Sequence, residues 1–187
     1  MTERTVQPGP DSPPPPAPAP LWRRLVFGRN PKRTLLRAAA LFVTAVVVFK
    51  FILLPVRIDG TSMEPAYHDH AINFINRLAY LGRPPQRGDV VGVRLSHPHG
   101  LSGPHVMYFK RLIGLPGETV AIRRGVVFIN GQPLEEPYVR AREVWEESPR
   151  TLKTGEYFVI GDNRGMPKYL HEHGIVDADR IVGKVLW

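Results

Sequence analysis

One serine lies in a setting that suggests chemistry. The chain contains no cysteine, so a side-chain nucleophile must be an oxygen. Residues 56–187 hold four serines, and Ser62 stands out because the run Gly60-Thr61-Ser62-Met63-Glu64-Pro65 directly follows the first predicted strand. Glycine lets a bound carbonyl approach the backbone, and proline stiffens the turn. A serine in such a turn usually serves the turn alone, so Ser62 needs a base beside it to act as a nucleophile.

Lys110 is the candidate base. None of the seven histidines lies in a recognisable triad context, whereas a lysine can remove a serine proton if it is uncharged. Burial among apolar groups lowers a lysine pKa from roughly 10 by several units. Strand alternation places Val106, Tyr108, Lys110 and Leu112 on one face. The alternative is a solvated lysine on an edge strand, and the spacing alone favours that alternative.

Eight short runs in residues 56–187 are rich in β-branched and aromatic residues, and glycine, proline or Asn-Gly separates them. They are VRID (56–59), AINFIN (71–76), DVVGVRL (89–95), VMYFKRLIG (106–114), TVAIR (119–123), VVFING (126–131), EYFVIGD (156–162) and RIVGKVLW (180–187). No long helical period interrupts them. We therefore predict a mainly β domain, a compact antiparallel sheet or barrel-like fold.

One apolar segment precedes this domain. Residues 38–54 carry a single charge, Lys50, and predict a transmembrane helix that is short for a bilayer. A buried core helix would need a polar face, and a cleavable signal peptide would need small residues where Leu53, Leu54 and Pro55 stand. Six basic residues between Arg23 and Arg37 precede the span, so the positive-inside rule predicts a cytoplasmic N-terminus over 1–37 and an extracytoplasmic domain over 56–187.

The basic charge is concentrated at the N-terminus. Of the net charge of +8, residues 1–37 contribute +5 (seven basic, two acidic) and residues 56–187 contribute +2 (17 basic, 15 acidic). A nearly neutral body argues against nucleic-acid binding. Residues 1–20 are rich in proline and predict a disordered tail, a tether in preference to a ligand for proline-recognition domains.

Five segments resemble, in order and approximate spacing, the boxes of bacterial type I signal peptidases, also called leader peptidases. They are GTSMEPAYHDHAINFINRLAY (60–80), PPQRGDVV (84–91), YFKRLIGLPGETV (108–120), FVIGDNR (158–164) and RIVGKVLW (180–187). The resemblance covers most of residues 56–187. It implies a membrane-anchored serine endopeptidase of mainly β fold that removes N-terminal signal peptides from exported proteins after small residues. It also implies Ser62 as nucleophile, Lys110 as general base, and no metal or other cofactor.

The resemblance extends to neighbouring residues and to partners. It implies that the Ser62 backbone N–H stabilises the oxyanion, and because Gly60 replaces a hydroxyl donor of some members, Thr61 is the hydroxyl that remains nearby. Met63 belongs to the shallow pockets that admit small side chains. The residues implied to support the site are Asp162, Asn163 and Arg164. We expect signal peptides and the lipid bilayer as partners, and a monomer with a single pass through the inner cell membrane.

The supporting box departs from the family pattern. Where the family continues with a serine, an aspartate and an arginine, this chain has Pro167, Tyr169 and His171, and no serine follows Ser148. A buried lysine base needs a neutral hydrogen-bonding neighbour, because a strong anion would raise its pKa. A backbone carbonyl, the Tyr169 hydroxyl and neutral His171 are the candidates, and His171 is our first choice.

Other readings stay open. The pairs His68-Asp69-His70, His97-Pro98-His99 and His171-Glu172-His173 could assemble a metal site, although His97 and His99 lie in a glycine- and proline-rich loop. A tethered module that lost activity at the altered box is a second alternative. A peptidase dedicated to one substrate, such as a conjugation pilin, is a third, and the sequence does not separate it from a general signal peptidase.

Overall fold

The computed structural model describes residues 30–94 and 107–186. The chain divides into two units, Met1–Ala45 and Val46–Trp187, and all described strands lie in the second. The predicted tail over 1–20 and the loop that carries His97 and His99 lie outside the described residues.

The first described element is an apolar helix. Helix α2 spans Pro31–Val47, and a π-helical segment, η1, continues it over Val48–Ile52. Asn30 caps its start, because the Arg33 N–H donates to Asn30 Oδ1 at 3.5 Å. The stretch Lys32–Ile52 is long and apolar enough to cross a membrane.

The observed helix differs from the predicted membrane helix over 38–54 at both ends, while the membrane span itself stays a prediction. The helix begins earlier, at Pro31, because basic residues end an apolar span without ending a helix. At the other end, Leu53 and Leu54 belong to strand β1 (Leu53–Arg57). Pro55 accounts for this, since the residue before a proline disfavours helical geometry, and Leu54 pairs with Ile75 instead.

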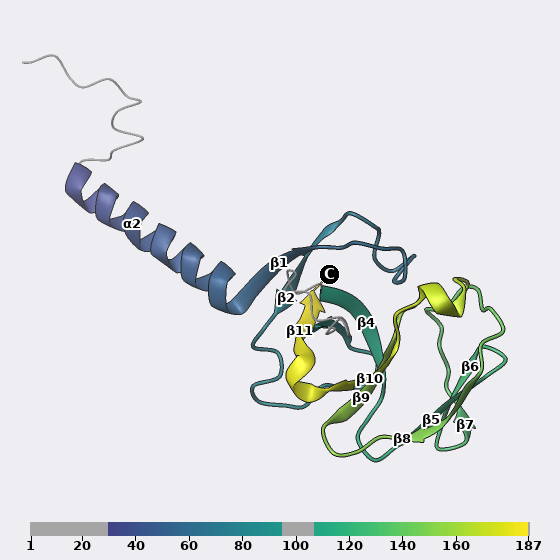
Figure 1. Ribbon diagram of the computed structural model, residues 1–187. Coiled ribbons are helices and arrows are strands. Elements are labelled where there is room, and N and C mark those ends of the chain that lie inside the picture. The colour runs from purple at the N-terminus through teal and green to yellow at the C-terminus, as the bar shows by residue number, and fades with distance from the viewer. Residues whose placement is uncertain (1–29, 95–106, 187) are drawn as a thin grey trace, which may run out of the picture. The chain divides into compact units, whose positions relative to one another are not determined.

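The larger sheet has seven antiparallel strands in the order β1-β2-β11-β3-β4-β9-β10. Figure 1 labels these strands except β3. Its other strands are β2 (Ile72–Asn76), β3 (Val90–Arg94), β4 (Met107–Gly114), β9 (Glu156–Ile160), β10 (Gly174–Asp177) and β11 (Ile181–Leu186). Two 3₁₀ turns lie before and after β10, η2 (Lys168–Leu170) and η3 (Ala178–Arg180).

A second, four-stranded antiparallel sheet has the order β7-β6-β5-β8. Its strands are β5 (Thr119–Arg123), β6 (Val126–Ile129), β7 (Gln132–Pro133) and β8 (Glu147–Thr151), which form a group of their own in Figure 1. An apolar cluster joins the two sheets, because Ile113 and Phe158 of the larger sheet pack with Val120 and Val127 of the smaller one.

The mainly β, antiparallel prediction is confirmed, and each of the eight predicted runs overlaps a strand, although the first run shares only Val56 and Arg57 with β1. Three strands were not predicted, namely β7, β8 and β10. Strand β8 reads ESPRT, which lacks β-branched residues on alternate positions, and its pairing with β5 places it in the sheet. Tertiary pairing overrides a weak local preference here.

Strand β4 lies in the interior of the larger sheet, between β3 and β9. Val91 of β3 stands directly opposite Lys110, and Val91 belongs to an apolar cluster that includes Leu112 and Val159. Phe109 points to the other face and into a different cluster, as strand alternation requires. The edge-strand alternative for Lys110 is therefore wrong.

Candidate active site

The Ser62 loop follows strand β1 and contains a tight turn. Gly60 has φ of +113°, a conformation that side chains with a Cβ rarely adopt, so glycine is needed where the chain leaves the strand. The turn is closed by the Glu64 N–H donating to the Thr61 carbonyl at 3.2 Å and the Tyr67 N–H donating to the Met63 carbonyl at 3.0 Å. These bonds hold the half-buried Ser62 at the surface of the domain.

Ser62 and Lys110 meet at this point. Lys110 Nζ lies 2.7 Å from Ser62 Oγ, and the lysine is 1% exposed. The two residues are 48 positions apart in the chain, so only the fold brings them together. A hydroxyl in hydrogen-bond contact with a buried amine is the geometry that a nucleophile and its base require.

Burial lowers the pKa of Lys110 from its ordinary 10.5 to about 8, because the apolar surroundings disfavour the ammonium. Glu172 opposes this effect, since its carboxylate favours the charged form and raises the lysine pKa. Glu172 and Lys110 line the same pocket, together with Val93 and Val176. The net result is a lysine that is uncharged in an appreciable fraction of molecules near neutral pH.

The segment Gly161–Asn163 holds the Ser62 loop from the other side. The Asn163 N–H donates to the Ser62 carbonyl at 3.0 Å, and Asn163 Nδ2 donates to the Thr61 carbonyl at 3.0 Å. A Cβ at Gly161 would collide with the Ser62 carbonyl and the His171 ring, so glycine permits this close approach. The box that follows β9 therefore positions the backbone of the candidate nucleophile.

Two buried ion pairs fix this box. Asp162 accepts two hydrogen bonds from Arg111, at 2.7 Å from Nε and 2.6 Å from Nη2. Arg164 is 1% exposed and pairs with the buried Glu136. A buried charge is tolerated when it is paired and hydrogen-bonded, so these pairs anchor the loop to β4 and to the segment after β7.

His171 is buried beneath the same loop. It is 3% exposed, and its Nε2 accepts a hydrogen bond from the Gly161 N–H at 2.8 Å. Burial first, and then the positive charge of Lys110, lower the pKa of His171 to about 3. The ring is therefore neutral at physiological pH. Its acceptor nitrogen therefore binds Gly161 and not Lys110, whose amine is hydrogen-bonded to Ser62 Oγ. Tyr169, the other side chain considered as a support for Lys110, is 85% exposed.

The remaining predicted residues lie around the serine. Thr61 Oγ1 donates to Met166 Sδ at 3.6 Å, and the oxyanion role expected for Thr61 stays a prediction. Met63 is 1% exposed, and it lines a small pocket beside Ser62 with Met107 and Phe109. The structure thus brings Thr61, Ser62, Met63, Lys110, Asn163 and His171 to one place, with Asp162 and Arg164 as buried anchors.

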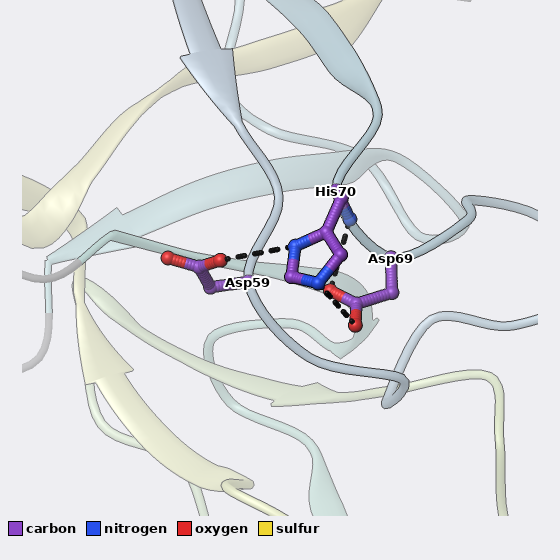
Figure 2. Close-up of side chains that lie close together, drawn as sticks. All are labelled: Asp59, Asp69 and His70. Carbon is purple, nitrogen blue, oxygen red and sulfur yellow. Dashed lines mark hydrogen bonds and ion pairs between the residues drawn. The ribbon is translucent and has the colours of Figure 1, made fainter.

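Among the described residues, potential metal ligands come together in one group, Asp59, Asp69 and His70, whose ligand atoms lie within 4.8 Å of one another. Figure 2 shows the His70 ring between the two carboxylates, at 3.5 Å from Asp59 and 3.4 Å from Asp69. The Asp59 and His70 side chains are 82% and 63% exposed, and Asp69 also accepts the Gly60 N–H at 2.9 Å. The contacts of these three side chains with one another and with the Gly60 N–H hold this exposed group together.

The described pair His171 and His173 is not part of such a group. His171 Nε2 is taken by the Gly161 N–H, and His173 Nδ1 lies 2.6 Å from the His171 carbonyl oxygen. The described residues thus bring no two of the predicted His-x-His pairs together.

A mainly β domain that holds a serine hydroxyl against a buried lysine amine defines a candidate hydrolase site of the Ser/Lys type. The family model described as signal peptidase, peptidase S26 matches residues 32–187. The chain is 31% identical over 158 residues to a probable signal peptidase I-2 of Synechocystis sp., covering 82% of this chain and 72% of the relative. It is 30% identical over 165 residues to signal peptidase IB of Staphylococcus aureus, covering 79% and 83%.

A crystal structure of a signal peptidase I from Enterococcus faecalis is also similar, at 29% identity and a TM-score of 0.41, covering 56% of this chain and 98% of that one. From the family match and the two relatives, the chain belongs to the signal peptidase, peptidase S26 family. It is therefore a serine peptidase, which is a hydrolase.

Sequence reasoning missed three charged residues of the site: Arg111, Glu136 and Glu172. Arg111 carries a signal, because it alternates with Lys110 in an apolar strand and a charge on the opposite buried face needs a partner. Glu136 and Glu172 lie in irregular segments, where no periodicity indicates which way a side chain points.

Proposed function

We propose that this peptidase removes N-terminal signal peptides from exported preproteins, with Ser62 as the nucleophile and Lys110 as the general base. The observation that carries the two roles is the 2.7 Å contact between Ser62 Oγ and a lysine amine that is almost fully buried. Membership of the signal peptidase family and similarity to signal peptidases I support the substrate class.

The first half of the reaction forms an acyl-enzyme. Neutral Lys110 accepts the Ser62 hydroxyl proton while Ser62 Oγ bonds to the scissile carbonyl carbon. The Ser62 backbone N–H stabilises the oxyanion, and the Thr61 hydroxyl is the side-chain donor nearest in sequence. When the carbon–nitrogen bond breaks, the Lys110 ammonium gives its proton to the leaving amine, which is the new N-terminus of the mature protein.

The second half restores the enzyme. Lys110, neutral again, accepts a proton from water as the water oxygen bonds to the acyl carbon. The bond between the acyl carbon and Ser62 Oγ then breaks, and the lysine returns the proton to the serine. The signal peptide leaves as a carboxylic acid, and both residues are in their starting states.

The pocket beside Ser62 fits a small substrate side chain. Met63, Met107 and Phe109 form its apolar part, and Met63 is fixed in the core, so the pocket does not widen at that side. The substrate segment would bind in an extended conformation, as peptides that add to a sheet do. This supports cleavage after small residues such as alanine.

The alternatives receive less support. A tethered module that had lost its activity would not need the contact between Ser62 and Lys110, and the contact is present. A peptidase for one dedicated substrate is not favoured, because the similar proteins are described as signal peptidases I.

The test uses the full chain in detergent and a precursor with Ala-x-Ala before the cleavage site. Wild-type protein should release the mature product, and both Ser62→Ala and Lys110→Met should reduce cleavage to background while unfolding at a temperature near that of wild type. His68→Ala, at an exposed position, is the matched control and should cleave normally. Turnover like that of wild type in either dyad variant would refute the assigned roles.

A further inference from the structure

His171 binds the segment that supports the Ser62 loop, and it lies close enough to Lys110 to feel its charge. Its Nε2 accepts the Gly161 N–H at 2.8 Å, and a Cβ at Gly161 would collide with the Ser62 carbonyl. Two residues further on, the Asn163 N–H donates to that carbonyl. A shift of the imidazole would therefore move the segment on which the Ser62 backbone rests.

The hydrogen bond fixes the state of the ring. An imidazole nitrogen that accepts a bond carries a lone pair, so in the neutral ring the proton sits on Nδ1. Nδ1 is buried and makes no well-formed hydrogen bond among the residues that the structure describes, and the Asn163 backbone lies close enough to act on the ring. A protonated ring would have N–H groups at both positions and could not accept the Gly161 N–H, so the contact requires neutral imidazole.

The ring is also held in place by aromatic packing. The Trp145 indole meets it edge-on with ring centroids 4.7 Å apart, and Trp145 is itself 2% exposed. Indole Nε1 donates to the Met166 carbonyl at 3.2 Å, which fixes the indole in turn. The imidazole therefore has little freedom to rotate away from Gly161.

We propose, on the basis of the function assigned above, that His171 is a positioning residue for catalysis: its neutral Nε2 holds Gly161 and hence the Ser62 loop, and it does so without placing a charge near the Lys110 amine. A carboxylate at this position would accept the same N–H but would favour the ammonium form of the base. An apolar side chain would leave a buried N–H without an acceptor.

The charged groups around this pair are few. Lys110, Arg164 and His173 lie near His171, and all three disfavour a positive charge on the ring. Glu172 is the acidic neighbour of Lys110. The Asn163 backbone opposes the effect of those three groups, because it favours the protonated ring.

Three variants at position 171 distinguish the effect of losing the hydrogen-bond acceptor from the effect of adding a negative charge. His171→Gln supplies a neutral amide oxygen at about the reach of Nε2, and it should keep kcat within about threefold of wild type with an unchanged pH–rate profile. His171→Ala removes the acceptor and should lower kcat at least tenfold, with KM and the acidic limb of the profile unchanged. His171→Glu keeps an acceptor but adds an anion, so the acidic limb should move to higher pH by one unit or more.

The measurements are kcat, KM and the pH dependence of precursor cleavage, with thermal unfolding of each variant in the same detergent. If the alanine variant does not fold, the Gln and Glu variants decide, because they differ in charge but both provide an acceptor. The inference is wrong if His171→Glu leaves the acidic limb where wild type has it, or if His171→Ala matches wild type across pH 6–9. It is also wrong if all three variants unfold at a lower temperature than wild type but keep the wild-type kcat per folded molecule.

Ser62→Ala in the same assay distinguishes this inference from the function on which it rests. If Ser62→Ala still cleaves, the assigned dyad fails whatever the His171 variants do. If Ser62→Ala is inactive while the His171 variants behave as wild type, only the positioning role fails.

Discussion

At the scale of single residues, a base at Lys110 must meet two conditions. It must be buried enough to lose its proton, and its amine must lie close enough to Ser62 to accept the hydroxyl proton. Both conditions hold, with 1% exposure and a 2.7 Å contact. With a pKa of about 8, about a tenth of the molecules have a neutral lysine at pH 7 and about half at pH 8. Burial thus makes Lys110 available for the base role that we propose, without a histidine triad.

Glu172 should tune this base. Because its carboxylate raises the Lys110 pKa, Glu172→Gln should lower that pKa and move the acidic limb of kcat/KM to lower pH. Glu172 is exposed, so the shift should be a few tenths of a unit at low salt and smaller at high salt. The check is a pH–rate profile at two ionic strengths.

Glu135→Gln is the matched control for that measurement, since it removes the same charge at another exposed position. Its profile should follow wild type. An equal shift in both variants would mean that net charge, and not the position of Glu172, sets the limb.

The sequence predicts the dyad residues better than their surroundings. Ser62 and Lys110 are assigned by the resemblance of their boxes, because residue type and spacing alone favour a turn serine and a solvated edge-strand lysine. The contact of His171 with Gly161 spans ten positions through an irregular segment, so no periodicity specifies it. The neutral state of His171 depends on burial that only the folded chain provides.

At the scale of elements, three segments build the site: the loop after β1, strand β4 and the loop after β9. Asn163 ties the two loops together through its backbone and its side chain. Strand β4 lies in the interior of the larger sheet, which gives the proposed base Lys110 a rigid support. The proposed nucleophile Ser62 lies on a loop, and the second loop holds that loop in place.

Asn163 offers a test at this scale. Asn163→Asp has nearly the same size but cannot donate to the Thr61 carbonyl, and Asn163→Ala removes the side-chain group entirely. Each variant loses one hydrogen bond of about 1 kcal/mol, so kcat should fall about fivefold to tenfold with a small change in KM. Steady-state kinetics with the Ala-x-Ala precursor measure this. Unchanged kcat in Asn163→Asp would show that the side-chain bond does not position the Ser62 loop.

Most of the strands can be predicted because β-branched runs alternate with turn residues. The missed strands β7, β8 and β10 are short or polar, and they exist through pairing with β6, β5 and β9. The division into two sheets depends on which apolar faces meet, as Ile113 and Val120 do, and that is a long-range property.

At the scale of the whole molecule, an apolar helix precedes the catalytic domain. Lys32–Ile52 can cross a membrane by length and composition, and seven basic residues lie within 1–37. The positive-inside rule then predicts that residues 1–37 stay in the cytoplasm and that the peptidase domain faces outward. That orientation would place the site where exported preproteins emerge.

Protease treatment of spheroplasts tests the orientation. In cells that express the full chain with a tag at each end, external protease should destroy the C-terminal tag and spare the N-terminal tag. Lysed spheroplasts, in which both tags should be cleaved, provide the control. Protection of the C-terminal tag in intact spheroplasts would overturn both the orientation and the proposed route of substrate access.

The central claim is that neutral Lys110 activates Ser62, and the pH dependence of kcat/KM for wild-type protein tests it most directly. The neutral amine is the active form, so kcat/KM should rise with pH through a single ionisation at about pH 8 and level off above it. Lys110→Met should show no turnover at any pH at which it stays folded. A profile that is flat from pH 7 to 9 would contradict the account. So would an acidic limb near pH 6.5, which is the ordinary pKa of a histidine side chain.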